Sequence, residues 1–225
     1  YLDAGSYGNS LTGTYTLSAV IDRGPIQDPT VPNPSPNDGF PSPTGFSRLD
    51  GFGTVNAERT FEQLLGFDLQ NRTNLGGDLW GLDQIGAPEV WTPSGSFLGS
   101  TGQGVTVAII DTGVDLDHPE FQGRIVAGYD FVDNDNDPND ENNHGTHVAG
   151  TIAGANDGVG ITGVAYDARI MPIRVLDAQG YGNTEDVISG IRWAADNGAD
   201  VINLSLGSNY FNQEYFNAIE YANNQ

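Results

Sequence analysis

The sequence lacks cysteine and lysine, and it carries little positive charge of any kind. Without cysteine its 225 residues form no disulfide bond, which leaves the cellular compartment undecided. The eight basic residues are all arginine and stand against 30 Asp and Glu, so the net charge is −22. A chain this acidic is not expected to bind nucleic acid through the phosphates. Its carboxylates suit a solvated surface or the binding of hard cations.

Long apolar runs are missing as well. No segment approaches the roughly 18 apolar residues of a membrane-spanning helix, so we expect no membrane span. The sequence starts at Tyr1 rather than at methionine. We therefore expect both ends to have been cut and any signal peptide to lie outside it. A hydrophobic content of 37% is enough for a packed core, which argues against wholesale disorder.

Composition divides the chain into three parts. Residues 1–24 contain the alternating stretch "GTYTLSAVI", which predicts a strand and suits the tail of a preceding β-domain or propeptide. Residues 25–74 are rich in Pro, Asn and Ser and are predicted to be a linker with one short helix at 56–66. Residues 75–225 have a different texture and form the third part.

Strands and helices alternate in this third part. We expect strands at 105–111, 124–131, 168–176 and 200–206, and helices at 147–155, 184–198 and 212–224. Such alternation implies parallel pairing through right-handed crossovers. The predicted fold class is therefore α/β: an open, mostly parallel sheet with helices on both faces, preceded by a β-strand and a Pro-rich linker.

Two polar residues stand where such folds place their chemistry. Asp111 is the last residue of a predicted buried strand, and His144 precedes a predicted helix of small residues. Ligands of open α/β sheets bind beyond the carboxyl ends of the strands. An Asp and a His that converge there are two members of a nucleophile–base–orienter system.

Four segments in this region resemble consecutive signatures of the subtilisin-like serine proteases, the subtilases. They are "VTVAIIDTGVDLDHPEF", "NNHGTHVAG", "GITGVAYDARIMPIRVLDAQGYG" and "DVINLSLGS", and "WGLDQIGAPEVW" resembles the segment that opens the family's catalytic domain. The resemblance covers residues 75–225. It implies a secreted or cell-envelope serine endopeptidase that cleaves polypeptides, with Asp111 as catalytic aspartate and His144 as catalytic histidine. His147 matches a second family histidine that faces the interior and is not catalytic.

The nucleophile that the resemblance implies is not in this sequence. The family's catalytic residues occur in the order Asp, His, Ser along the chain. The serine lies in a Gly-Thr-Ser motif, and an Asn that binds the oxyanion precedes that motif. We expect both beyond Gln225, in the missing carboxyl-terminal part of the same domain, and we expect the 225-residue chain alone to be inactive. The alternative is a catalytically silent, calcium-binding fragment or pseudoprotease module.

The resemblance also implies part of a substrate cleft. Gly180, Tyr181 and Gly182 match the strand edge that pairs with an extended substrate, and glycine permits close backbone approach. Ser205, Leu206 and Gly207 match one wall of the primary specificity pocket. Without the family resemblance, these glycines are more simply interpreted as turns.

The acidic residues before His144 suggest calcium as a cofactor. The alternating oxygens of Asp133, Asp135, Asp137 and Asn139, with Asp140 beside them, suit a cation that takes six to eight oxygen ligands. A solvated acidic loop is the alternative. The family resemblance adds a second candidate, in which Glu120 and Asp157 contribute and the loop 155–161 wraps the ion.

Three other patterns compete with this interpretation. Asp-Thr-Gly at 111–113 fits the aspartic protease signature, which needs a second aspartate and an all-β fold. "GVGITG" at 158–163 fits a dinucleotide fingerprint, which should follow a strand and open a helix. His144 and His147 have a spacing that permits a transition metal. The α/β pattern and the flanking residues favour the subtilase interpretation over all three.

Overall fold

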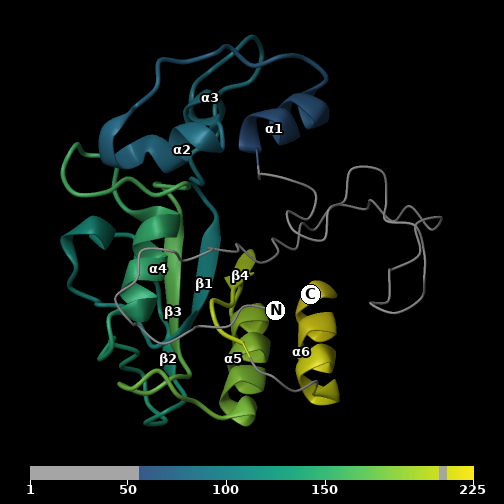
Figure 1. Ribbon diagram of the computed structural model, residues 1–225. Helices are drawn as coiled ribbons and strands as arrows, with labels where there is room; N and C mark the ends of the chain where they lie inside the picture. The colour runs from purple at the N-terminus through teal and green to yellow at the C-terminus, as the bar shows by residue number, and fades with distance from the viewer. Residues whose placement is uncertain (1–55, 208–211) are drawn as a thin grey trace, which may run out of the picture. The chain divides into compact units, whose positions relative to one another are not determined.

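Figure 1 shows the computed structural model, which describes residues 56–207 and 212–225. The strand predicted in residues 13–21 and the Pro-rich stretch up to residue 55 lie outside the described residues, so the three-part division of the chain stays a prediction. The described residues belong to two compact units, 56–99 and 100–225. Within these described ranges, no helix has the length and apolar character needed to cross a membrane.

The unit 56–99 is a small helical assembly. Helix α1 (Ala57–Leu65) matches the helix predicted at 56–66: Asn56 Oδ1 accepts a hydrogen bond from Arg59 N at 2.6 Å, and Gly66 ends the helix in the left-handed region. The 3₁₀ turn η1 (Gly77–Leu79), α2 (Trp80–Gln84) and α3 (Ala87–Trp91) follow, and α1 packs against α3. The predicted linker helix therefore belongs to the same unit as residues that resemble the start of a peptidase domain.

The unit 100–225 is built on a four-stranded parallel sheet. Its strands are β1 (Thr106–Asp111), β2 (Tyr129–Asp130), β3 (Arg169–Arg174) and β4 (Val201–Asn203), in the order β2-β3-β1-β4. The central strand β1 pairs with β3 over its whole length, from Thr106 opposite Arg169 to Asp111 opposite Arg174. The α/β prediction is confirmed, and Asp111 ends the central strand.

Strand β2 is much shorter than the predicted strand at 124–131, and Pro172 explains why. On the side of β3 that faces β2, Ile170 N donates to Arg124 O, and Arg174 O accepts from Phe131 N. The residue midway between them, whose N–H would continue this ladder, is Pro172. Proline has no N–H to donate, so the pairing reduces to one bridge at Ile125 and a two-residue strand.

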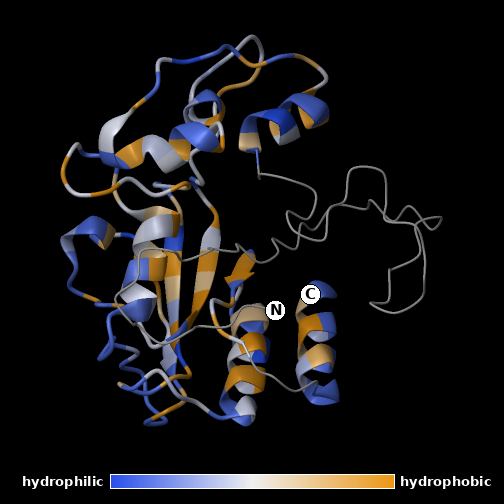
Figure 2. Ribbon diagram, viewed as in Figure 1, coloured by the Kyte–Doolittle hydropathy of each residue, from blue (hydrophilic) through white to orange (hydrophobic). Residues whose placement is uncertain are grey.

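Helices cover both faces of the sheet, as predicted. Helix α4 (His144–Ala153) packs on one face, and α5 (Thr184–Asp196) and α6 (Gln213–Asn223) pack on the other (Figure 1). Side chains of β1 alternate between the two cores: Ala108 and Ile110 face α5, while Val107 and Ile109 face α4. Burial on both faces is why the strand is a continuous apolar run, which is orange along the sheet in Figure 2.

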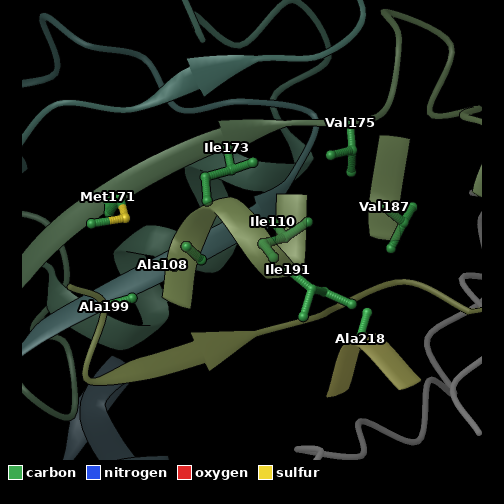
Figure 3. Close-up of a cluster of buried hydrophobic side chains, with 10 residues drawn as sticks. Ala108, Ile110, Met171, Ile173, Val175, Val187, Ile191, Ala199 and Ala218 are labelled. Atoms are coloured by element: carbon green, nitrogen blue, oxygen red, sulfur yellow. The ribbon is translucent and has the colours of Figure 1, made fainter. Parts of the chain in front are cut away.

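The core on the α5 side consists of small and branched side chains (Figure 3). It combines residues of β1 and β3, the residue after β3, α5 and α6, among them Ile110, Ile173, Val175, Val187, Ile191 and Ala218. Complete burial of such a side chain contributes about 1.5–3 kcal/mol when it is as large as Ile or Val. This packing fixes the carboxyl ends of β1 and β3, where the polar residues lie.

Several helix boundaries differ from the sequence prediction: α4 begins at His144 rather than at 147, and α5 ends at Asp196 rather than at 198. Thr184 is the first residue of α5, and the cap of this helix is Asn183, whose Oδ1 accepts from Asp186 N at 2.9 Å. Gly198 follows the helix in a left-handed conformation, as expected of a closing glycine.

Candidate active site

The structure brings Asp111 and His144 into direct contact. His144 Nδ1 lies 2.7 Å from Asp111 Oδ1, which also accepts a hydrogen bond from Thr112 N at 2.7 Å. Asp111 is fully buried, whereas 36% of the His144 side chain is exposed. A buried carboxylate that accepts from Nδ1–H leaves Nε2 as the unprotonated nitrogen. The pair is therefore suited to taking a proton from a group that approaches the exposed side of the ring.

The surroundings of His144 favour its protonated form. The hydrogen bond to Asp111 raises the pKa of His144 above its ordinary value, and the negative charges of Asp111 and Asp140 add to this effect. Partial burial of the ring opposes them and lowers the pKa. The position at the helix N-terminus also disfavours a positive charge. Asp111 thus stabilises the imidazolium that a general base becomes during reaction.

Helix α4 begins unusually close to the exit of β1. A Cβ at position 145 would lie 2.0 Å from Gly113 O, so only glycine permits this approach. Gly145 N donates to Thr112 Oγ1 at 2.9 Å. Because His144 precedes Gly145, the close approach of the helix carries the imidazole to the end of the strand.

The interior position expected of His147 is not formed within the described residues. Its side chain is exposed. The buried residues of α4 are Gly145, Ala149, Gly150 and Ala153. His147 follows Gly145 by two positions, which places it on nearly the opposite side of a helix with 3.6 residues per turn. It neither contacts Asp111 nor joins His144 at a common point.

The predicted substrate edge is an exposed turn organised by Asp177. Asp177 Oδ1 accepts from Gln179 N and Tyr181 N, and Tyr181 O accepts from Asp177 N. Tyr181 is 76% exposed. A Cβ on Gly182 would lie 2.1 Å from Val175 O, so glycine is needed for the chain to pass here. Among the described residues, no backbone partner occupies Gly180 O, Gly182 N or Gly182 O.

Asn142 connects this turn to His144, and sequence reasoning missed it. Its Nδ2 donates to Ala178 O at 2.9 Å, and its Oδ1 accepts from His144 N at 3.3 Å. One side chain thus fixes the distance between the histidine and the predicted substrate edge. Asn142 lies two residues before the observed start of α4, and an Asx residue near a helix start was the available signal, because Asx side chains often cap helices.

The predicted pocket wall, Ser205, Leu206 and Gly207, follows β4. Strand β4 pairs with β1, with Asn203 opposite Ile109. Continuation of this register places Ser205 level with Asp111. Ser205 Oγ accepts from Asn203 Nδ2 at 2.9 Å, and Gly207 is exposed. The wall therefore starts at the same edge of the sheet as the Asp111–His144 pair.

The four aspartates of the predicted calcium loop do not converge on one point. Arg174, which is 4% exposed, pairs instead with Asp130, Asp133 and Glu141, each at 2.8 Å. Asp135 Oδ1 accepts from Asp137 N at 2.8 Å. In residues 56–207 and 212–225, no group of three or more His, Asp or Glu side chains is placed to hold a metal ion.

Asp140, the fifth residue of that run, also has other partners. Five donors from Thr112, Asn142, Asn143 and Thr146 reach its carboxylate oxygens. Its acceptor capacity is therefore used within the chain. As arranged here, the loop 133–140 does not fit a calcium ion, because an arginine and N–H and O–H donors already meet its charge.

The second calcium candidate fits better. Glu120 Oε2 accepts from Ala155 N at 2.8 Å, and Glu120 Oε1 lies 2.5 Å from where a Cβ of Gly160 would stand. The loop 155–161 thus passes close to this carboxylate, at a glycine whose backbone is in the left-handed region, with φ 68°. Asp157 Oδ1 accepts from Val159 N at 2.9 Å within the same loop. One carboxylate surrounded by a tight loop suits a cation that is bound largely by carbonyl oxygens.

Comparison with known proteins identifies the family. The model of the subtilase family (Peptidase_S8) matches residues 102–225, more than half of the sequence, and the chain belongs to this family. It is 52% identical over 128 residues to the thermophilic serine proteinase of Bacillus sp. (strain AK1), covering 56% of this chain and 31% of that protein. It is 44% identical over 147 residues to thermitase of Thermoactinomyces vulgaris, covering 65% of this chain and 50% of that protein.

Comparison of structures agrees with the fold. The solved structure of sphericase matches with 35% identity and a TM-score of 0.52, over 61% of this chain and 48% of that one. The chain therefore has the subtilisin-like α/β architecture, and it spans about a third to a half of the relatives that it matches.

The geometry disagrees with the three competing interpretations: an aspartic protease, a dinucleotide site and a transition-metal site. Asp-Thr-Gly at 111–113 ends a parallel strand rather than lying in an all-β fold. The "GVGITG" segment follows α4 and leads toward β3, which is the reverse of a dinucleotide site. His144 binds Asp111 while His147 is exposed, so the two histidines do not share a metal.

Proposed function

We propose that the whole protein is a serine endopeptidase of the subtilisin type, acting outside the cell or in its envelope. In this proposal Asp111 and His144 are two members of the triad, and the serine lies outside the present sequence. The observation that carries it is the 2.7 Å contact between a buried carboxylate and a half-exposed imidazole at the carboxyl end of the central strand. Membership of the subtilase family supports it.

In the proposed reaction, the serine Oγ attacks the carbonyl carbon of a peptide bond while Nε2 of His144 takes the hydroxyl proton. The resulting imidazolium is stabilised by Asp111. His144 then gives its proton to the leaving amine, which produces an acyl-enzyme and a free amino terminus. Water, deprotonated by the same histidine, hydrolyses the ester and regenerates the serine. The present chain supplies the base and its orienting partner.

The proposed substrate is an extended polypeptide. The edge of the exposed turn offers both acceptors and a donor to another strand: the carbonyls of Gly180 and Gly182 and the N–H of Gly182. Asn142 ties this edge to the first turn of α4. A peptide bound there would therefore have a fixed position relative to His144, which is the basis of proximity in catalysis.

Labelling with a fluorophosphonate tests the proposal. The whole protein is expected to be labelled at one serine beyond Gln225, and the 225-residue chain alone is expected to show neither labelling nor peptidase turnover. Peptide mapping by mass spectrometry locates the label. Stoichiometric labelling at a serine between Tyr1 and Gln225 would contradict the proposal. A whole protein that is folded but unlabelled would favour the alternative, a silent pseudoprotease module.

We further propose that calcium stabilises the fold at the Glu120 loop. Glu120 and Asp157 would hold the ion together with carbonyls of residues 155–161, and the ion would offset their negative charge. An ion that binds only the folded state stabilises it by about 2.7 kcal/mol at a hundredfold excess over Kd. Chelation is therefore expected to lower the melting temperature, and magnesium should substitute poorly.

The melting experiment separates the two candidate sites. It uses whole protein with an inactivated nucleophile, which prevents autolysis, in calcium and in chelator. Glu120→Gln is expected to lose most of the difference, and the double variant Asp135→Ala, Asp137→Ala is expected to keep it. The reverse pattern would mean that calcium binds at the acidic loop 133–140 instead. Equal melting temperatures of the otherwise unsubstituted protein in calcium and in chelator would mean that calcium does not stabilise the fold.

A further inference from the structure

We infer that Asp140 is a positioning residue for the catalytic pair: its carboxylate joins the exit of β1 to the first turn of α4 and so fixes the separation of Asp111 and His144. The inference deepens the proposed function. Its kinetic test rests on that function, whereas its spectroscopic test is independent of it. Asp140 contacts neither the histidine ring nor Asp111. It acts through the backbone and hydroxyl groups around them.

The contacts of Asp140 fall into two sets. On the helix side, Oδ1 accepts from Asn142 N at 2.9 Å and from Asn143 N at 3.0 Å, and Oδ2 accepts from Thr146 N at 2.9 Å and from Thr146 Oγ1 at 2.6 Å. On the strand side, Oδ1 accepts from Thr112 Oγ1 at 2.8 Å. The helix contacts bracket His144 in sequence, and the strand contact comes from the neighbour of Asp111.

Two further hydrogen bonds close this network. Thr112 Oγ1, which donates to Asp140, accepts from Gly145 N at 2.9 Å. Thr146 Oγ1, which also donates to Asp140, accepts from Asp115 N at 2.9 Å. Each threonine hydroxyl therefore connects helix α4 to the loop after β1, and both depend on one carboxylate as their acceptor.

The residue at the capping position of α4 makes no side-chain hydrogen bond to the helix. That residue, Asn143, is left-handed, with φ 84°. Asp140 Oδ2 supplies the acceptor for Thr146 N from outside the helix, beside Thr112 Oγ1, which accepts from Gly145 N. Burial has the largest single effect on the pKa of Asp140 and raises it. The hydrogen bonds from Thr146, Asn142 and Thr112 lower the pKa, and together they hold it below its usual value. The carboxylate thus stays ionised and strongly accepting.

Two matched substitutions isolate the network. Asp140→Asn keeps the shape of the side chain but turns an acceptor into a donor that faces other donors. Thr112→Val keeps the volume but removes the hydroxyl between Asp140 and Gly145, and Thr112→Ser retains that hydroxyl. Asp200→Asn is the control, because Asp200 Oδ2 likewise accepts a backbone N–H, from Thr106 at 2.9 Å, at the opposite end of β1.

The first readout is the NMR resonance of the His144 Nδ1–H in the full chain. A proton held between imidazole and carboxylate resonates at low field and exchanges slowly. We expect the resonance in the unsubstituted chain, in Thr112→Ser and in Asp200→Asn. We expect it to broaden or vanish in Asp140→Asn and in Thr112→Val. Should Asp140→Asn fail to fold, Thr112→Val decides, since Asp140 keeps its contacts to α4 there.

The second readout is kinetic and uses the whole protein. Asp140→Asn is expected to lower kcat about 10²-fold, the effect of a displacement near 1 Å, and to change KM much less. An unchanged resonance and an unchanged kcat in Asp140→Asn would overturn the inference, as would an equal loss in Asp200→Asn. If the whole protein has no peptidase activity but the resonance still depends on Asp140, the proposed function fails and the positioning role stands.

Discussion

Replacement of His144 by alanine is expected to lower kcat of the whole protein by about 10⁴- to 10⁶-fold, a magnitude known from triad knockouts in subtilisin, a member of the same family. The expectation follows from the contact of His144 Nδ1 with Asp111 Oδ1, which leaves Nε2 free to take the proton of the nucleophile. Alanine removes the base and leaves the neighbouring Gly145 and its backbone contacts in place.

The control for this substitution lies on the same helix. His147→Ala removes an imidazole three residues along α4 that makes no hydrogen bond to Asp111, and it should leave kcat near that of the unsubstituted protein. Hydrolysis of a peptide substrate measures both variants, and thermal unfolding checks that each is folded. Activity of His144→Ala within about tenfold of the unsubstituted protein, far from the triad-knockout magnitude, would contradict the assignment of His144 as the base.

The second large effect is expected from Asp111→Asn, with a loss in kcat of about 10⁴-fold, as for the aspartate of other triads. In the structure, Oδ1 accepts from both His144 Nδ1 and Thr112 N, and the buried Oδ2 has no partner among the described residues. An asparagine that keeps its oxygen on His144 buries an amide N–H₂ without an acceptor. An asparagine that flips turns a donor toward the imidazole and imposes the wrong tautomer. Either orientation loses the anion that stabilises the imidazolium.

Asp115→Asn is the matched control, since Asp115 follows the same strand but its carboxylate accepts, among the described residues, only from Asp117 N within its own loop. It should retain nearly all activity. Peptide hydrolysis at saturating substrate measures kcat for both variants. Equal losses in the two variants would mean that the loop, rather than the Asp111 carboxylate, is what matters.

The sequence was sufficient to place Asp111 and His144 at the ends of their elements. A continuous apolar run ended in Asp111, a small-residue helix followed His144, and parallel strands share the edge at which their carboxyl ends meet. Local pattern therefore predicts the fold class and the pair. It does not predict how far an element extends: Pro172, which interrupts the β2 ladder, acts on residues more than forty positions earlier in the sequence.

The acidic run before His144 shows the main limit of sequence reasoning at this site. Alternating aspartates suggested one cation, but Arg174 on β3 pairs with Asp133 and Glu141, and Asp140 accepts from α4 and Thr112. A carboxylate has the same appearance in a sequence whether it meets a metal, an arginine or an N–H group. Only the three-dimensional pairing separates these roles, and it turned Asp140 from a predicted ligand into a candidate positioning residue.

Asp111 is expected to make His144 a stronger base, and NMR titration of the His144 ring measures this effect. The hydrogen bond and charge of Asp111 raise the pKa of His144 above the ordinary value of 6.5, and burial lowers it. Because the base must be neutral, activity should fall as the pH drops through the raised pKa. The folding stability that the charged histidine contributes should be fully present below pH 6.5 and lost as the pH rises through that raised value. We expect a pKa of His144 above 6.5 in the unsubstituted protein and a lower pKa in Asp111→Asn, whereas a pKa at or below 6.5 that is the same in both proteins would show that Asp111 does not strengthen the base.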